Sequence, residues 1–415
     1  MIMYIKLINC SAVHIYQESA YVYTDSAIYV LDEISSRFVE LLRHTSEYDK
    51  LLNAFEKSLN FARQEAVDTI QEIIDVNKKF FSFSDTPNNI CITGRCGMAY
   101  PHMLQISLTN RCVHNCRHCF KNCVFTGKSL SYSVITGLLD QISSECKSVE
   151  FTGGEPFLHN DIMNLVTRYQ DKISFNVTTS GFILHQFNIS DLKKFHLIQI
   201  SLHGSTEQMH DAFVGKNGSF KMVTKNIKWL CDNELNVVLS RTIVVFDKKE
   251  LEGFINLCIS LGVKRLILGI ILPLGRAVQN NCATANEECR RLEEFLEDSR
   301  NKYKEISIAV DNETAVSNKP SKYVFHCIGG RLHWYVNEDG AVYPCTYCQR
   351  EELSIGNLID NPDLFNEIIY NGKYEEYNQR IANNFYVIND LYRYQKLSIN
   401  DICSNIREAE IQDKL

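Results

Sequence analysis

The first residues that could do chemistry are Cys112, Cys116 and Cys119, which have C-x-x-x-C-x-x-C spacing. Thiolates at this spacing can converge from one short loop onto three irons of a cubane iron–sulfur cluster, which leaves the fourth iron without a protein ligand. An iron left open in this way can chelate the amino and carboxylate groups of a small molecule. The spacing alone leaves two alternatives, a zinc knot and a set of unconnected thiols.

A second motif, Thr152-Gly153-Gly154-Glu155-Pro156, follows the next strand of the expected sheet. Its glycines allow the backbone to approach a bound small molecule, and Glu155 can accept a hydrogen bond from a ligand amine. A strand-to-helix turn would explain the same glycines and proline without any ligand. The position beside the cysteine stretch favours the functional interpretation.

Together the two motifs resemble the radical S-adenosylmethionine (SAM) superfamily over roughly Met103 to Ala277. The resemblance implies that Cys112, Cys116 and Cys119 hold a 4Fe-4S cluster that cleaves SAM to a carbon-centred radical. It also implies SAM-binding roles for six residues at strand ends: Gly153, Gly154, Glu155, Pro156, Ser180 and Ser201.

The chain departs from the family pattern at two positions. His203 stands where an acid is usual, and Val214 stands where an arginine is frequent. Arg241 is therefore a candidate partner for the SAM carboxylate, with a purely structural arginine as the alternative. Three further cysteines near the first motif are candidate ligands or catalytic thiols: Cys91, Cys96 and Cys123.

A second set of cysteines follows the expected barrel, in a region that resembles the SPASM extension or its shorter twitch form. The resemblance implies an auxiliary iron–sulfur cluster on Cys327, Cys345 and Cys348, with Cys403 or a substrate atom completing it. A zinc site on the same thiols is the alternative, because sets of four cysteines bind both metals.

Six apolar strands alternate with helical stretches between Met103 and Pro273, which predicts an α/β fold with a parallel sheet. The resemblance makes this sheet a partial (β/α)6 TIM barrel, with active residues on the loops after its strands. The expected units are a front domain at 1–85, a linker at 86–102, the barrel at 103–280, and a bridging helix with the cluster extension at 281–415. The expected strands are Leu104 to Leu108, Ser148 to Phe151, Ile173 to Thr178, Leu197 to Leu202, Val237 to Val244 and Leu266 to Ile271.

The front domain has short strands followed by helices, an order typical of a winged-helix-like unit. It resembles a RiPP recognition element, the domain that captures the leader of a ribosomally made precursor peptide. Its 8 basic and 13 acidic side chains give a net charge of −5, which disfavours the DNA-binding alternative. A structural cap on the barrel is a further alternative.

The whole chain carries a net charge of −7 and 16 cysteines, without a secretory signal or a membrane-spanning stretch. We therefore expect a cytoplasmic protein that binds neither nucleic acid nor membrane. The hypothesis is an oxidoreductase-type radical SAM enzyme that modifies a precursor peptide by a thioether, a carbon–carbon crosslink or an epimerisation. It would receive electrons from a donor such as flavodoxin or ferredoxin. The alternatives are a maturase of a folded protein, a small-molecule pathway enzyme, and a non-catalytic iron–sulfur or zinc regulator.

Overall fold

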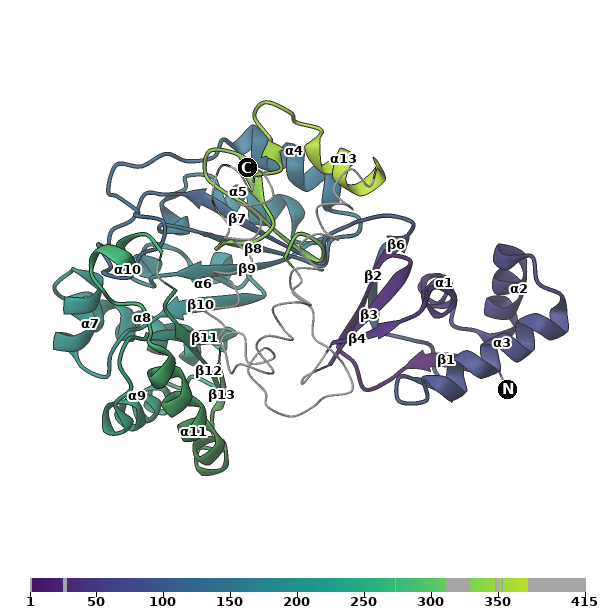
Figure 1. Cartoon of the computed structure of the whole chain (residues 1–415), viewed down its shortest axis with the longest axis horizontal. Coiled ribbons are helices and arrows are strands. Elements are labelled where there is room, and N and C mark those ends of the chain that lie inside the picture. The colour runs from purple at the N-terminus through teal and green to yellow at the C-terminus, as the bar shows by residue number, and fades with distance from the viewer. Residues whose placement is uncertain are drawn as a thin grey trace.

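The computed structural model describes residues 2–24, 28–272, 274–310, 329–347, 349, 351 and 354–371 of the chain. Figure 1 shows a large sheet covered by helices, with a smaller front unit beside it. Helix α13 (Leu364–Asn371), at the end of the described chain, lies against the barrel near helix α4 (Tyr132–Ile142). The site is therefore built mainly by the large sheet and its loops.

The large sheet has ten strands in the order β13-β12-β11-β10-β9-β8-β7-β14-β15-β16. Strands β7 to β13 are parallel and follow one another in chain order, which confirms the predicted α/β barrel-type fold. They are β7 (Met103–Thr109), β8 (Ser148–Gly153), β9 (Ser174–Thr179), β10 (Leu197–Ser201), β11 (Val237–Ile243), β12 (Arg265–Ile270) and β13 (Ser307–Val310). The connecting helices are α4, η1 (Pro156–Leu158), α5 (Ile162–Tyr169), η2 (Leu184–Gln186), α6 (Ile189–Leu192), α7 (Glu207–Val214), α8 (Ser219–Asp232), α9 (Lys248–Ser260), α10 (Arg276–Gln279) and α11 (Asn286–Lys302).

The two faces of the parallel strands differ in polarity, as β7 illustrates. Leu104, Ile106 and Leu108 are fully buried in the core between sheet and helices. Gln105 and Ser107 alternate with them and therefore lie on the opposite, inner face of the strand. The helices bury the apolar face, so the inner face of this strand is free to carry polar groups.

The strands that follow the barrel in sequence extend its sheet at both edges. Strand β13, expected in the 281–415 unit, pairs in parallel with β12, and β14 (His333–Val336) pairs in parallel with β7. Strand β15 (Ala341–Tyr343) returns antiparallel through a hairpin turn at Asn337 to Gly340, and β16 (Gly356–Asn357) and α13 (Leu364–Asn371) follow. This topology brings the extension directly against the strand that precedes the cysteine stretch.

The front unit has its own hydrophobic core, separate from that of the barrel. A two-stranded sheet pairs β1 (Tyr4–Leu7) with β5 (Phe81–Ser84), and a four-stranded sheet has the order β4-β3-β2-β6. The other elements are β2 (Ala12–Gln17), β3 (Ser19–Tyr23), β4 (Ile28–Leu31), α1 (Glu33–Leu42), α2 (Tyr48–Leu59), α3 (Arg63–Val76) and β6 (Cys91–Cys96). Strand β6 lies in the segment expected to be a linker, so this segment completes the front sheet.

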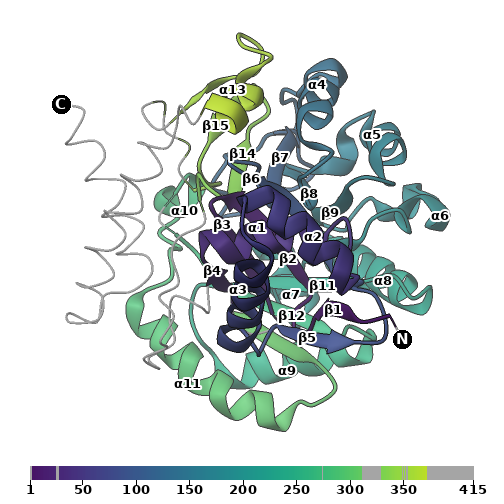
Figure 2. The same ribbon diagram turned by 90° about the vertical axis from the view of Figure 1, so that its right-hand side faces the viewer.

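An ion-pair cluster joins the front unit to the barrel. The Glu145 carboxylate, whose side chain is only 2% exposed, accepts from the Arg43 Nη2 atom at 2.6 Å and from the Arg95 Nε atom at 2.6 Å. Arg43 lies at the end of α1, Arg95 on β6, and Glu145 just beyond α4 of the barrel. Figure 2, viewed from the side of the front unit, shows the front helices lying in front of the barrel sheet. Two guanidinium groups thus stabilise one buried carboxylate at the junction.

Candidate active site

The three cysteines of the first motif lie on one loop directly after β7. The Cys116 thiol is close enough to those of Cys112 and Cys119 to interact with both electrostatically. Burial raises the pKa of Cys112 to about 12, whereas hydrogen bonds from Cys123 lower the pKa of Cys119 to about 6. The structure thus brings together the three thiols that the spacing predicted.

The donor set of this loop consists of three thiols, the ligand type of a cubane iron–sulfur cluster. In the described part of the chain, no group of three or more His, Cys, Asp or Glu side chains converges as ligands of a single ion. A cubane takes each thiolate on a different iron, so its ligands need not converge on one point. The thiols of Cys112, Cys116 and Cys119, which lie near enough to interact electrostatically, are compatible with that arrangement.

An arginine after the last predicted barrel strand holds the loop from outside. Arg276 donates from Nε to the carbonyl of Cys116 at 2.9 Å and from Nη1 to the carbonyl of Cys123 at 2.9 Å, and its amide donates to the carbonyl of Cys119 at 3.0 Å. A Cβ on Gly275 would lie 2.3 Å from the Phe120 oxygen, so only glycine fits there. Sequence reasoning missed this clamp, although a Gly-Arg pair just after a strand is a recognisable signal.

The two glycines of the second motif make room for the cysteine loop. A Cβ on Gly153 would lie 2.2 Å from the Thr109 oxygen, and one on Gly154 would lie 2.2 Å from the Arg111 oxygen. The amide of Gly154 donates to Thr109 at 2.7 Å. In this structure, the backbone at the two glycines therefore lies close to the segment that carries the cysteines. Contact of the same glycines with SAM stays a prediction.

Glu155 ties the ends of two strands together. Its carboxylate accepts from Thr179 Oγ1 at 2.6 Å, from the Ser180 amide at 3.0 Å, from the Ser180 hydroxyl, and from the Phe157 amide at 3.3 Å. Burial raises the pKa of Glu155 above its ordinary value, against the effect of these hydrogen bonds. The carboxylate is thus oriented by the protein itself, and its role toward a ligand amine stays a prediction.

The remaining predicted SAM residues lie at neighbouring strand ends. Pro156 begins η1, Ser180 follows β9, and Ser201 ends β10. The Ser201 hydroxyl lies 3.4 Å from that of Ser240 on β11. These positions share the carboxyl edge of the sheet with the cysteine loop, where parallel barrels carry their sites.

A buried histidine network supports the other side of the loop. The amide of His203 donates to His210 Nδ1 at 3.0 Å, which leaves His210 Nε2 as the donor to the Ser219 hydroxyl at 3.0 Å. Ser219 in turn lies 3.0 Å from His114 Nε2 on the cysteine loop. The carbonyl of Val214 accepts from the Asn115 amide at 2.9 Å. The α7 segment therefore contacts the loop through its backbone.

Arg241 has a structural role. Its Nη2 atom pairs with Glu250 on α9, and its guanidinium lies 4.5 Å from the ring centroid of Phe254 on the same helix. The side chain thus faces the helix-covered side of the sheet, which contradicts its candidacy for the SAM carboxylate. Side chains alternate between the two faces of a strand, so the residue type alone did not show on which face Arg241 lies.

The other candidate cysteines separate in space. Cys91 and Cys96 belong to β6 of the front sheet, which contradicts a role for either at the first cluster. Cys123 is buried beside Cys119, and its amide donates to the Cys119 sulfur at 3.4 Å. Of the second set, Cys345 lies in the described turn after β15, where its sulfur accepts from the Tyr347 amide at 3.4 Å. Three predicted ligands lie outside the described residues: Cys327, Cys348 and Cys403.

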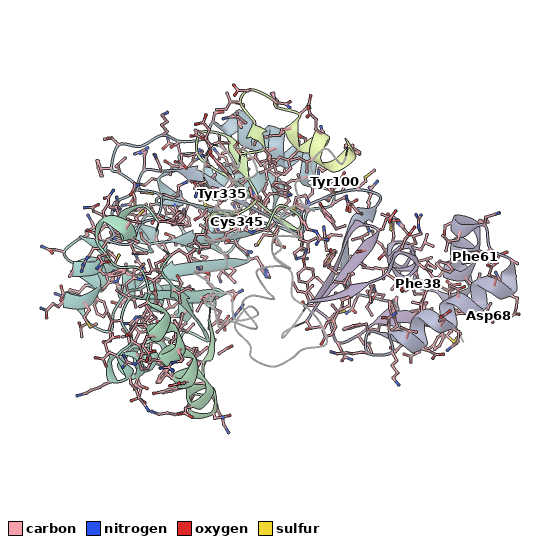
Figure 3. The ribbon with its side chains drawn as sticks, in the orientation of Figure 1. Phe38, Phe61, Asp68, Tyr100, Tyr335 and Cys345 are labelled. Carbon is pink, nitrogen blue, oxygen red and sulfur yellow. The ribbon has the colours of Figure 1, made fainter. Side chains whose placement is uncertain are left out.

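The extension meets the cysteine loop through polar and aromatic contacts. Lys121, two residues after Cys119, reaches the Tyr335 hydroxyl at 2.6 Å and the Glu338 carboxylate. Phe120 packs edge-on against Tyr347, with 5.9 Å between ring centroids. Figure 3 labels Tyr335 and Cys345 where the extension meets the barrel. The primary cysteine loop and the segment that carries Cys345 are thus in direct contact.

Comparison with known proteins identifies two domains in the chain. Residues 106–258 match the radical SAM superfamily, and residues 327–405 match the SPASM iron–sulfur cluster-binding domain. The chain thus carries a radical SAM domain in its barrel. It carries a SPASM-type domain after the barrel, and these two domains bind a SAM-cleaving 4Fe-4S cluster and auxiliary iron–sulfur clusters, respectively.

The chain is similar to two curated proteins and to one solved structure. It is 25% identical over 280 residues to the sporulation killing factor maturation protein SkfB of Bacillus subtilis, covering 65% of each chain. It is 24% identical to the subtilosin biosynthesis protein AlbA of the same organism, covering 68% of this chain but 63% of AlbA. The fold is similar to that of Streptococcus suis SuiB bound to its precursor peptide SuiA, with a TM-score of 0.63, 14% identity, and coverage of 87% and 86%. Both curated relatives are thus matched over slightly less than two thirds of their own length.

Proposed function

We propose that the chain is a peptide-modifying radical SAM enzyme that acts on a ribosomally made precursor peptide in the cytoplasm. The observation that carries this proposal is the three-thiol loop, which is clamped by Arg276 at the carboxyl edge of the barrel and is contacted by the SPASM-type extension. SkfB is named for maturation of the sporulation killing factor and AlbA for biosynthesis of the antilisterial bacteriocin subtilosin, and these two roles support the substrate class. The sheet of the front unit supplies a surface on which such a peptide could bind.

An iron–sulfur cluster and SAM, when bound at this loop, would supply radical chemistry, namely reductive cleavage of SAM coupled to removal of hydrogen from the peptide. The residues of the chain hold and orient these groups. Cys112, Cys116 and Cys119 would hold the cluster, with flavodoxin or ferredoxin as electron donor. The strand-end residues would line the SAM site: Gly153, Gly154, Glu155, Pro156, Ser180 and Ser201.

The front unit would bind the peptide leader as an added strand. Strand β4 ends its sheet and, among the described strands, pairs only with β3. Val30 on β4 is 55% exposed, and Ile34 on the adjoining first turn of α1 is 44% exposed. An open strand edge supplies main-chain hydrogen bonds, and exposed apolar side chains beside it select the peptide sequence. The winged-helix character of the unit stays part of this proposal.

Two measurements test the proposal. The anaerobically reconstituted enzyme should form 5'-deoxyadenosine with SAM and a reductant, whereas the variant with Cys112, Cys116 and Cys119 all changed to Ala should form none. A matched variant at Cys10, Cys231 and Cys258 controls for the loss of three thiols. Residual SAM cleavage in the first variant would contradict the central claim.

The leader proposal is tested on the full chain, because β6 lies beyond residue 85 and a fragment ending there would lack a strand of the sheet. Short peptides encoded beside the gene are titrated against the wild type, Val30→Glu and the control Val76→Glu, which changes a valine that is 72% exposed on α3. Val30→Glu should weaken peptide binding at least tenfold and spare SAM cleavage without peptide. Equal binding by the two variants, or saturable binding of duplex DNA and not of peptide, would refute leader recognition at β4.

A further inference from the structure

Lys121 is a buried cation that connects the cysteine loop to the extension. Its side chain is 3% exposed, and Nζ lies 2.5 Å from a carboxylate oxygen of Glu338, which is 13% exposed. The same carboxylate accepts from the Ser107 hydroxyl at 2.9 Å. Glu338 lies in the turn between β14 and β15, so the pair joins two segments more than two hundred residues apart in sequence.

Lys121 lies in the turn that folds back onto a predicted cluster ligand. The amide of Asn122 donates to the carbonyl of Cys119 at 3.4 Å, and the amide of Cys123 donates to the Cys119 sulfur at 3.4 Å. The backbone of Lys121 therefore belongs to the cysteine loop, whereas its side chain contacts the extension. The positive charge reaches the loop as well, because Lys121 acts electrostatically on the Cys123 thiol.

A buried ion pair at this position is not explained by stability alone. Removing two charges from water costs about as much as their attraction returns, and apolar side chains of similar volume are often as stable or more so. In the same low-polarity surroundings, the electrostatic field of an uncompensated charge extends farther than it does in water. A lysine beside the cluster loop therefore affects that cluster strongly unless a carboxylate neutralises it.

We infer that Glu338 neutralises Lys121 and thereby sets the reduction potential of the primary cluster. This inference rests on the proposed function, in that Cys112, Cys116 and Cys119 carry a redox-active cluster. Paired with the Glu338 carboxylate, the ammonium of Lys121 adds little net charge beside the cysteine loop. Without that carboxylate, the positive charge of Lys121 would favour the more negative, reduced form of the cluster, so reduction would become easier.

The test is an EPR-monitored potential titration of the reconstituted full chain and its variants, without SAM or peptide. Glu338→Gln should raise the midpoint potential of the primary cluster, because Lys121 is then unpaired. Lys121→Met should lower it, because the carboxylate is then unpaired. The double variant should return close to the wild-type value. A structural role alone would not produce shifts of opposite sign that cancel.

The matched control is the surface pair Lys302 and Glu252, 2.8 Å apart, whose Lys302→Met and Glu252→Gln variants should leave the potential unchanged. Iron content is measured for each variant, and if Lys121→Met assembles no cluster, Lys121→Arg should restore assembly and the wild-type potential. Three outcomes would overturn the inference. They are no shift in Glu338→Gln, shifts of the same sign in both single variants, and a Lys121→Arg variant that does not restore cluster assembly and the wild-type potential. A wild-type protein without a cluster would instead overturn the proposed function.

Discussion

Arg276→Ala should loosen the cysteine loop without unfolding the barrel. The wild-type guanidinium makes two hydrogen bonds at 2.9 Å, to the carbonyls of Cys116 and Cys123. Hydrogen bonds from a charged group contribute roughly 1.5–3 kcal/mol each, and the lower figure applies because Arg276 is only half-buried. Their joint loss lowers the free energy of local loop opening by about 3 kcal/mol, which corresponds to a roughly 100-fold larger open population.

Alkylation of the apo protein measures this population directly. The rate at which iodoacetamide modifies Cys116, followed by mass spectrometry of its peptide, is proportional to the open fraction when closing is fast. Arg276→Ala should react roughly 100-fold faster than the wild type. Arg276→Lys should fall between the two, because an ammonium lacks the fork that bridges two carbonyls. The exposed Arg168→Ala is the control, and equal rates for Arg276→Ala and the wild type would refute the clamp.

Three further predictions concern the junction, its buried histidine and the second metal site. In urea unfolding, Glu145→Ala should lower the free energy of unfolding of the front unit by about 3 kcal/mol, because two guanidinium groups lose their buried partner. The control Asp140→Ala, at an exposed carboxylate, should lower it by less than about 0.5 kcal/mol. Burial lowers the pKa of His14 from 6.5 to about 4. As pH falls from 6.5 toward 4, His14 takes up a proton in the unfolded protein but not in the folded one, so the folded protein loses stability over this range. His14→Gln should therefore flatten the fall in unfolding free energy over that pH range by up to about 3 kcal/mol, and an unchanged slope would contradict the assignment. Cys345→Ala with Cys348→Ala should reduce bound iron to that of one 4Fe-4S cluster while SAM cleavage survives, and zinc in place of excess iron would contradict an auxiliary cluster.

Much of the barrel could be predicted from local patterns. Six alternating apolar strands place β7 to β12, because period-two burial against helices leaves a direct trace in the residues. The cysteine spacing also brought Cys112, Cys116 and Cys119 together, since all three lie on one loop and need no long-range folding to meet. The strand β6 was missed because its Cys91 to Cys96 sequence is short and polar, and its parallel pairing with β2 joins residues about eighty positions apart.

The sequence by itself determined the chemistry of this protein: the ligand types, their spacing, and the order of strands that carries them. Only the tertiary structure decided which charged side chains lie beside the cysteine loop. Arg241 was a candidate for the site yet pairs with Glu250 on α9. Arg276 drew no prediction yet contacts the cysteine loop, and Lys121 drew none yet joins that loop to the extension. The physical reason is that a long charged side chain reaches several ångströms from its backbone. Its partner is therefore chosen by packing between distant elements, which a local pattern does not record.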